Sequence, residues 1–469
     1  TSSHHSPSCR AMSDAMAARS VVIFVMPPDR GHLLYTVHIA AELHRRGYAI
    51  EYWSPSTAAP AVPAFAAFHS LTDAGDATFD RFCRTYCNAS CYGDTYEECD
   101  ARLEEELPKH MAAEFGDPER DTAGMQGTRE ALVRMKQRVL GGDVALCVLD
   151  TSHLYAWIGQ HCAALGVPTV GLCPTPLWLH LGKDFVPMLP GHLGEEPEYR
   201  PVRRSLDAVP HRVLYTLLPD LLEGVAVPGG HRVTGPVMPG GGEAAEEQRA
   251  TLAASGLRAW CDGAETPVVY VSFGSMARRG PVQPVARRLV EALAGGPWRV
   301  LVAAAPALFE GQPLPATVRV EDWVPQSAVL AHPIVRAFVS HCGATSISEA
   351  VLHAVPIVAL PLFHDQYFNA RRIVACGAAV AELPKSFAPE AALAAVRRAV
   401  ESEEAAAGAQ AASRRLRECD GLAAVVEEME AAGEARRLSQ PRAPRRRREW
   451  RPRPAGSARG VFGEREHFW

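Results

Sequence analysis

Two groups of polar residues in this 469-residue chain could do chemistry, and both stand beside apolar runs that are typical of buried β-strands. The larger group lies between Trp323 and Gln366, where a Trp and a Gln precede an apolar run and a His-Cys-Gly turn follows it. A predicted helix, a second apolar run and an Asp-Gln pair complete the stretch. In an open parallel sheet, phosphates bind at the carboxyl ends of strands and the first turns of helices. We therefore expect a phosphate-binding edge here.

The residue types in this stretch suit different parts of a nucleotide. Trp323 offers a flat face for stacking on a base, with a core Trp as the less favoured alternative. Gln326 offers a donor and an acceptor to a base edge, although alone it would be a surface Gln. Several hydrogen-bond donors at predicted strand ends could hold a diphosphate together with the backbone N–H groups of the helix that starts near Ala344. These residues are Ser275, His341, Gly343, Thr345 and Ser346.

The second group consists of His32 and Asp150, far apart in the sequence. His32 stands in the predicted loop after the apolar run Val21–Met26, and Asp150 ends another apolar run. A neutral imidazole can take a proton from a hydroxyl at physiological pH, and a carboxylate can orient the ring and stabilise it once charged. Asp150 could instead cap a helix, and Asp143 and Asp29 are weaker candidates for the partner of His32.

Taken together, these motifs carry a family resemblance. W-x-P-Q, H-C-G-x-x-S-x-x-E, V-P and D-Q, within 44 residues, resemble the signature box of the family 1 UDP-sugar-dependent glycosyltransferases. G-H after the first predicted strand, V-S-F-G-S at the start of the second half and F-N-A after D-Q extend the resemblance from about Val21 to Gly377. The resemblance implies an α/β protein with the GT-B fold, in which two Rossmann-like parallel-sheet domains face a cleft.

The resemblance also implies roles for single residues in the donor site. Trp323 and Gln326 would hold the uridine, and Glu349, otherwise a solvated helix carboxylate, would bind the ribose. Asp365 and Gln366 follow a predicted strand and would bind the transferred hexose. Asn369 also matches the F-N-A motif, but a helix-capping role is at least as good an interpretation.

In the other half of the chain, the resemblance makes His32 the general base and Asp150 its orienting partner. The sequence departs from the family pattern at four positions. Tyr35 replaces the usual Pro after G-H-x-x, and Ala354 replaces the common Gly before V-P. Ala344 and Thr345 replace the Trp-Asn of plant members, which removes an Asn contact to phosphate and leaves the sugar preference open.

The hydrophobic pattern predicts two α/β halves that would position these residues. Residues 1–19 and the Arg-rich tail, 434–469, are expected to be disordered. Residues 20–235 would form the N-terminal acceptor-binding domain, 236–266 the linker and 267–433 the C-terminal UDP-sugar-binding domain. Continuous apolar runs predict most of the strands. These runs are Val21–Met26, Tyr48–Trp53, Val144–Leu149, 166–172, Val268–Phe273, Arg299–Ala303, Val318–Glu321, Ala337–Ser340 and Val355–Leu360.

Composition favours a cytoplasmic protein. The twelve Cys do not form a small disulfide framework, and we see neither a secretory signal nor an apolar run long enough to cross a bilayer. Cys83, Cys87, Cys91 and Cys99 could share a helical face, but their spacing matches no metal signature, so we expect no metal. We expect a monomer that binds no nucleic acid and needs no cofactor, with the UDP-sugar as co-substrate.

We therefore expect an inverting, metal-independent glycosyltransferase that moves a hexose, with glucose favoured, from a UDP-sugar to a hydroxyl of a small hydrophobic acceptor. The loosely patterned segments 55–142 and 174–215 would build the acceptor pocket. Three alternatives remain. The chain could glycosylate a sterol or lipid at a membrane surface, where the basic tail would have a use. It could bind UDP-sugar without catalysis, or it could be an epimerase on the same fold.

Overall fold

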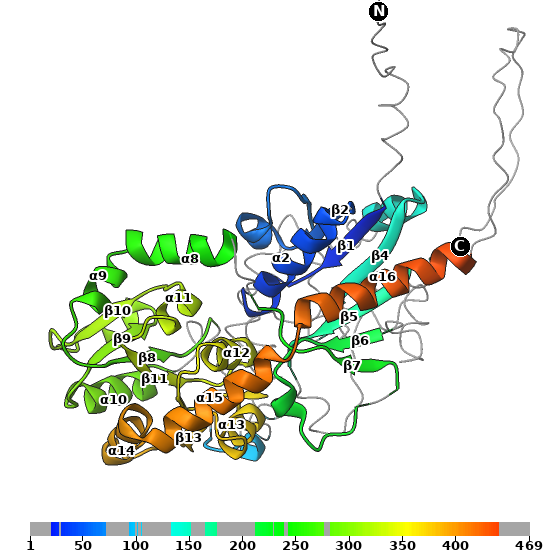
Figure 1. Ribbon diagram of the computed structural model, residues 1–469. Helices are drawn as coiled ribbons and strands as arrows, with labels where there is room; N and C mark the ends of the chain where they lie inside the picture. Colours follow the sequence, from blue (N-terminus) through cyan, green and yellow to red (C-terminus); the bar gives the residue numbers. More distant parts are fainter. Residues whose placement is uncertain are drawn as a thin grey trace, which may run out of the picture.

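The computed structural model describes residues 20–27, 30–71, 93–98, 101, 105, 133–151, 165–175, 212–227, 229–238, 243–275 and 282–439. These residues form two separate parallel β-sheets with helices packed on them (Figure 1). Both sheets are built from strand–helix–strand units, so the prediction of two Rossmann-like α/β halves is confirmed. The two terminal segments that we expected to be disordered lie outside the described residues, except that the last helix extends into the second of them as far as Ser439.

The first sheet has seven parallel strands in the order β3-β2-β1-β4-β5-β6-β7. Helix α2 (Arg30–Arg45) follows β1 and packs on one face. The helical residues 133–140 pack on the other face through Met135 and Val139. Short 3₁₀ helices η1 (Ser56–Ala61) and η4 (Pro219–Leu222) lie in the connections. The strands are β1 (Val21–Val25), β2 (Ala49–Ser54), β3 (Ala67–Ser70), β4 (Val144–Asp150), β5 (Thr169–Cys173), β6 (Arg212–Tyr215) and β7 (His231–Val233).

The second sheet has six parallel strands in the order β10-β9-β8-β11-β12-β13. The core on one face is formed with α10 and α14, and on the other with α11, α12, α13 and α15. The strands are β8 (Val268–Ser272), β9 (Arg299–Ala303), β10 (Val318–Glu321), β11 (Val335–Ser340), β12 (Ile357–Ala359) and β13 (Ala379–Glu382). The helices are α10 (Gln283–Ala294), η6 (Pro306–Phe309), α11 (Gln326–Leu330), α12 (Ala344–Leu352), α13 (Gln366–Ala375), α14 (Pro389–Glu401) and α15 (Glu403–Arg417).

The predicted strands that are buried on both faces all occur, whereas four strands had no clear sequence signal. Three of these four, β3, β7 and β13, lie at the edges of their sheets, and the fourth, β6, is next to β7. They are only three or four residues long and include half-exposed positions, so they lack a continuous apolar run. A second correction concerns His32. We placed it in a loop, but α2 begins at Arg30, which puts His32 in the first turn of the helix.

The two halves are connected twice. The predicted linker, residues 236–266, contains two helices, α8 (Glu243–Ala254) and α9 (Leu257–Asp262). The last helix, α16 (Gly421–Ser439), whose residues we had assigned largely to the C-terminal domain, packs against α2, β4 and β5 of the first sheet (Figure 1). The two connections touch at Gly235 and Gly421, where a Cβ on Gly421 would lie 2.7 Å from the Gly235 carbonyl oxygen. Only glycine fits this backbone contact at Gly421.

Ala354 adopts a left-handed backbone conformation, with φ of 54°. This position ends the turn between α12 and β12, where the family pattern that the sequence resembles has Gly. A Cβ in this conformation costs about 1–2 kcal/mol, because it crowds the following carbonyl oxygen. The Ala at this departure from the family pattern is therefore strained, and the rest of the turn holds it in place.

Replacing Ala354 with Gly is expected to raise the free energy of unfolding by roughly 0.5–1 kcal/mol. Gly stabilises the folded state because it removes the strain of a Cβ in the left-handed conformation. Part of this gain in stability is offset, because Gly also raises the conformational entropy of the unfolded chain. Urea denaturation measures the change. Ala407→Gly, on the exposed side of α15, is the matched control and should cost about 1 kcal/mol, because its backbone is helical. A destabilised A354G variant would contradict the strain argument.

Candidate active site

The predicted site residues gather where the strand order of each sheet reverses. In the first sheet, β1 and β4 are neighbours, and the chain leaves them in opposite directions across the sheet. In the second sheet the same is true of β8 and β11. Such switch points leave a crevice at the carboxyl ends of the strands, and ligands of open α/β sheets bind there. His32 and Asp150 flank the first switch point, and Ser275 and His341 flank the second.

His32 and Asp150 are in direct contact. The Nδ1 atom of His32 lies 2.9 Å from Oδ2 of Asp150. The Asp150 side chain is 1% exposed, whereas that of His32 is 26% exposed. The carboxylate accepts a hydrogen bond from Nδ1, so the neutral imidazole has its lone pair on Nε2. The structure therefore brings His32 and Asp150 together. The helix that Asp150 could instead cap lies outside the described residues.

Asp365, at the start of α13 in the second half, interacts electrostatically with His32, in the first turn of α2 in the first half. Burial raises the pKa of the Asp365 carboxyl, while hydrogen bonds from Asn369 and Thr175 and the charge of His32 act to lower it. Thr345 makes a second contact between the halves, because its hydroxyl lies 3.5 Å from the Gly31 carbonyl oxygen. The first turns of α2 and α12 therefore meet across the space between the sheets.

His341 is held rigidly at the end of β11. Its ring is buried, and Nδ1 donates to the carbonyl oxygen of Ser272 at 3.2 Å. The Nε2 atom lies against two glycines, since a Cβ on Gly274 or Gly343 would come within 2.4 or 2.6 Å of it. Gly274 begins the turn that contains Ser275, and Gly343 immediately precedes α12. The turns after β8 and β11 thus enclose one imidazole beside the N-terminus of a helix.

The residues predicted for the uridine form a second cluster. Trp323 is 47% exposed, so it is not a core Trp and its ring can accept a stacking partner. Gln326 begins α11, and its Oε1 atom accepts a hydrogen bond from the hydroxyl of Tyr270 at 3.0 Å. Its Nε2 atom donates to Ser346 Oγ at 3.1 Å and to the carboxylate of Glu349. The structure therefore brings Gln326, Ser346 and Glu349 together.

Glu349 is a half-buried carboxyl rather than a solvated one. Burial raises its pKa to about 7, and the hydrogen bond from Gln326 offsets only part of that effect. A carboxyl with this pKa changes charge near neutral pH, which is uncommon for Glu. Burial of this kind is typical of groups at functional sites.

The Asp-Gln pair begins α13, directly after the turn that follows β12. Gln366 is buried, and its Oε1 atom accepts from the backbone N–H groups of Leu362 at 2.9 Å and Phe363 at 3.1 Å. Asn369, for which we left helix capping open, instead donates to Asp365 Oδ2 at 2.8 Å and to the Cys342 carbonyl at 2.9 Å. Asn369 thus orients Asp365 and ties α13 to the His-Cys-Gly turn.

Sequence reasoning missed three contributors. Tyr270, Ser272 and Thr175 contact Gln326, His341 and Asp365 respectively. Tyr270 lies inside an apolar strand, where its type indicates core packing. Ser272 contributes through its backbone carbonyl oxygen, which no side-chain pattern reports. Tyr35, at the position of the usual Pro, is buried near Asp150 and Thr216. Burial and the charge of Asp150 both raise the pKa of the Tyr35 hydroxyl.

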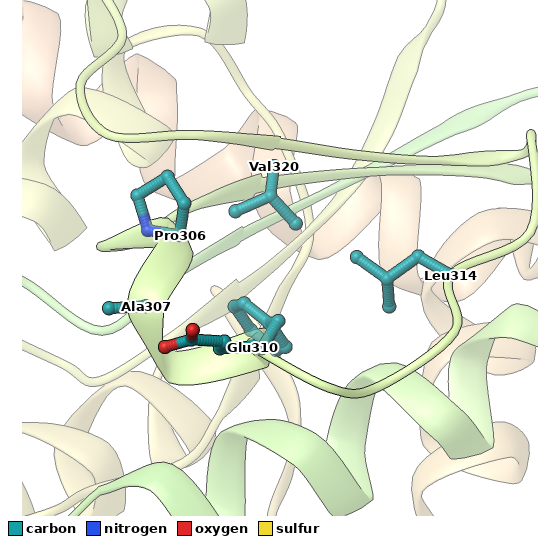
Figure 2. Close-up of a pocket in the computed structure, with 6 residues that line it drawn as sticks. Pro306, Ala307, Glu310, Leu314 and Val320 are labelled. Carbon is teal, nitrogen blue, oxygen red and sulfur yellow. The ribbon is translucent and has the colours of Figure 1, made fainter.

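An apolar hollow of about 370 Å³ lies elsewhere, beside η6 and the edge strand β10 (Figure 2). None of the predicted site residues lines it. Its lining residues are Pro306, Ala307, Phe309, Glu310, Leu314 and Val320. Among the described residues, no group of three or more His, Cys, Asp or Glu is placed to hold a metal, and Cys83, Cys87, Cys91 and Cys99 lie outside them.

Comparison with known families agrees with this geometry. Residues 246–406 match the family model described as "UDP-glucoronosyl and UDP-glucosyl transferase". This stretch contains every predicted donor-site residue. This third of the chain is thus similar to the UDP-glycosyltransferase family. Human UDP-glucuronosyltransferase 3A1 is 41% identical over 108 residues, which are 23% of this chain and 21% of that protein. An ecdysteroid UDP-glucosyltransferase of Lymantria dispar multicapsid nuclear polyhedrosis virus is 38% identical over 142 residues, 30% of this chain and 28% of that protein.

The matches to these UDP-glycosyltransferases thus span less than a third of either relative's length. Solved structures cover far more of the chain. The glycosyltransferase SnogD from Streptomyces nogalater superposes with a TM-score of 0.58 and 18% identity, over 88% of this chain and 99% of that one. The calicheamicin glycosyltransferase CalG4 gives 0.57 and 21%, over 89% and 98%. These likenesses confirm the GT-B fold. In the described part of the chain, no helix is long and apolar enough to cross a membrane.

The raised pKa of Glu349 predicts a pH-dependent effect of Glu349→Gln on stability. The folded carboxyl has a pKa of about 7 against 4.5 for an ordinary Glu. Between these values the unfolded chain has lost the proton and the folded chain keeps it, so wild-type stability falls as pH rises. Gln mimics the protonated form at every pH.

The variant should therefore gain about 2 kcal/mol more over wild type at pH 8 than at pH 5. Urea denaturation at the two pH values measures the difference. Glu310→Gln, which changes an exposed carboxylate of the same half, is the control. An E349Q effect of equal size at both pH values would contradict the buried-carboxyl account.

Proposed function

We propose that the chain is an inverting, metal-independent glycosyltransferase that moves a hexose, with glucose favoured, from a UDP-sugar to a hydroxyl of a small hydrophobic acceptor. One observation carries the proposal: the buried Asp150 holds His32 at the edge of one sheet, within electrostatic range of Asp365 at the edge of the other. A base and a candidate sugar ligand thus meet in one place. The match of residues 246–406 to the UDP-glucuronosyl and UDP-glucosyl transferase model supports the donor class.

The donor would lie across the second sheet. Trp323 would stack on the uracil, Gln326 would meet its edge, and Glu349 would accept hydrogen bonds from the ribose. The backbone N–H groups at the start of α12, with His341 and the hydroxyls of Ser275, Thr345 and Ser346, would face the diphosphate. These hydrogen bonds would offset the negative charge of the diphosphate without a metal ion. His341 would take part as an imidazolium, because its Nδ1 already donates to Ser272. Asp365 and Gln366 would bind hydroxyls of the hexose. Only the amide nitrogen of Gln366 would donate to the sugar, because its oxygen already accepts two backbone bonds.

The transfer would be a single displacement. Nε2 of His32 takes the proton of the acceptor hydroxyl while the hydroxyl oxygen bonds to the anomeric carbon. The bond from that carbon to the β-phosphate oxygen breaks, and its electron pair leaves with UDP. Attack opposite the leaving group inverts the anomeric centre through an oxocarbenium-like transition state. Asp150 stabilises the imidazolium through Nδ1, and the charge of Asp365 acts in the same direction.

The activities of two similar proteins support the donor and acceptor classes. One relative is a UDP-glucuronosyltransferase and another an ecdysteroid UDP-glucosyltransferase, so hexose donors and a hydrophobic acceptor both occur among similar proteins. For this chain, a cytoplasmic, monomeric enzyme without a cofactor remains part of the proposal. The segments proposed for the acceptor pocket, 55–142 and 174–215, lie largely outside the described residues.

Substituting His32 by Ala is expected to lower kcat/KM about 10²–10⁴-fold, the range that general bases contribute. The dissociation constant for UDP should stay within about twofold, because UDP would bind to the other sheet. Product formation from UDP-glucose and a panel of phenols and sterols gives the first quantity, and titration calorimetry gives the second. His38→Ala removes a half-buried imidazole from the same helix and is the matched control. Full activity in a folded H32A variant would refute the mechanism.

A further inference from the structure

A short segment of the first half of the chain is docked on the second sheet. Residues Gly93–Glu98 lie between β3 and β4 in sequence, yet their described long-range contacts are with α13 and the turn after β13. In Figure 1 this light-blue piece stands beside α13, away from β3 and β4. The segment bends into the first turn of a helix. There Thr95 Oγ1 accepts from the Glu98 N–H at 3.2 Å, and the Glu98 carboxylate accepts from the Asp94 N–H at 2.7 Å. This T-x-x-E pattern resembles a helix capping box.

Two side chains attach the segment to the second half. The Asp94 carboxylate accepts from the backbone N–H of Ser386 at 2.9 Å and also from the Ser386 hydroxyl. The Tyr96 ring is only 8% exposed and lies 4.9 Å from the ring of Phe368 on α13. Hydrogen bonds to a charged acceptor are stronger than those between neutral groups, and a buried aromatic ring removes a large apolar area from water. Both contacts therefore hold the segment against the second half. We call Gly93–Glu98 the docking segment.

The docking segment is connected to the turn that shapes the sugar-binding pair. The hydroxyl of Tyr367 lies 3.3 Å from the Gly93 carbonyl and 3.2 Å from the Leu362 carbonyl. The ammonium group of Lys385, a buried cation, donates to the same Leu362 carbonyl at 2.8 Å and lies over the Tyr367 ring. The backbone N–H of Leu362 in turn donates to Gln366 Oε1. One continuous set of contacts therefore runs from Gly93 to the Asp365–Gln366 pair.

We propose that the docking segment positions Asp365 and Gln366 for the hexose, so that residues that do not touch the donor tune how tightly its sugar is held. The inference rests on the proposed function, because it takes Asp365 and Gln366 as the sugar ligands. Asp94 and Tyr96 are positioning residues in this scheme. The uridine cluster of Trp323, Gln326 and Glu349 lies on other elements, so affinity for UDP alone should not depend on the docking segment.

The test compares UDP with UDP-glucose on the full chain by titration calorimetry. Asp94→Ala and Tyr96→Ala are expected to weaken UDP-glucose binding roughly tenfold, the effect of weakening one hydrogen bond between a sugar hydroxyl and a charged group such as Asp365. Their affinity for UDP should stay within about twofold of wild type. Asp94→Asn retains an acceptor for the Ser386 N–H and should largely restore UDP-glucose binding. Glu97→Ala, an exposed position of the same turn, is the matched control.

Hydrogen exchange gives a readout that does not depend on function. Residues 362–368 and 384–388 should exchange faster in D94A and Y96A than in wild type and in E97A. Unchanged exchange in the folded variants would overturn the docking role itself. Faster exchange with equal loss of UDP and UDP-glucose affinity, or with no loss of either, would overturn the positioning role. If wild-type protein binds neither UDP nor UDP-glucose, the proposed function fails, and with it the role in sugar binding, while the exchange data still decide the docking.

Discussion

A carboxylate that is almost fully buried must be paired, because an isolated charge in the interior is costly to keep. Asp150 meets this requirement through His32, and the contact is possible only because β1 and β4 are adjacent in the sheet. The helix that follows β1 starts beside the end of β4, so its first turn can reach the buried carboxylate. The order of the strands thereby determines where the imidazole stands and which of its nitrogens faces away from the core.

The second sheet has the same arrangement of adjacent strands at its switch point, but different residues follow them. There β8 and β11 are adjacent, and the turns that follow them enclose His341 between two glycines beside the start of α12. This edge is crowded: Cys342 and His364, which flank the donor-site residues, both have positive φ values. Strained backbone of this kind persists only where surrounding contacts hold it, and it is frequent at functional sites. Asn369 supplies one such contact by binding the Cys342 carbonyl.

The predictable parts of this structure are those that local patterns specify. β1 and β8 are continuous apolar runs buried on both faces, and α12 begins directly after His-Cys-Gly, so each could be placed from sequence. The spaced motifs also selected His32 and Asp150, which the structure brings into contact, and the residues proposed for the donor. The hydrogen bond of Glu349 with Gln326 joins two helices across twenty-three positions, and no local pattern reports it. The contact of Asp94 with Ser386 joins positions 292 residues apart, so it too needed the tertiary structure.

The most direct test of the account follows the fate of the sugar. Purified protein is incubated with UDP-glucose and a mixture of phenols and sterols, and UDP release, acceptor mass and anomeric configuration are measured together by mass spectrometry and NMR. The account predicts one UDP released per hexose transferred to an acceptor hydroxyl, with the anomeric centre inverted. Tight UDP binding without hexosylated product, for UDP-glucose and for other UDP-hexoses alike, would contradict the central claim that these two sheet edges form one catalytic site.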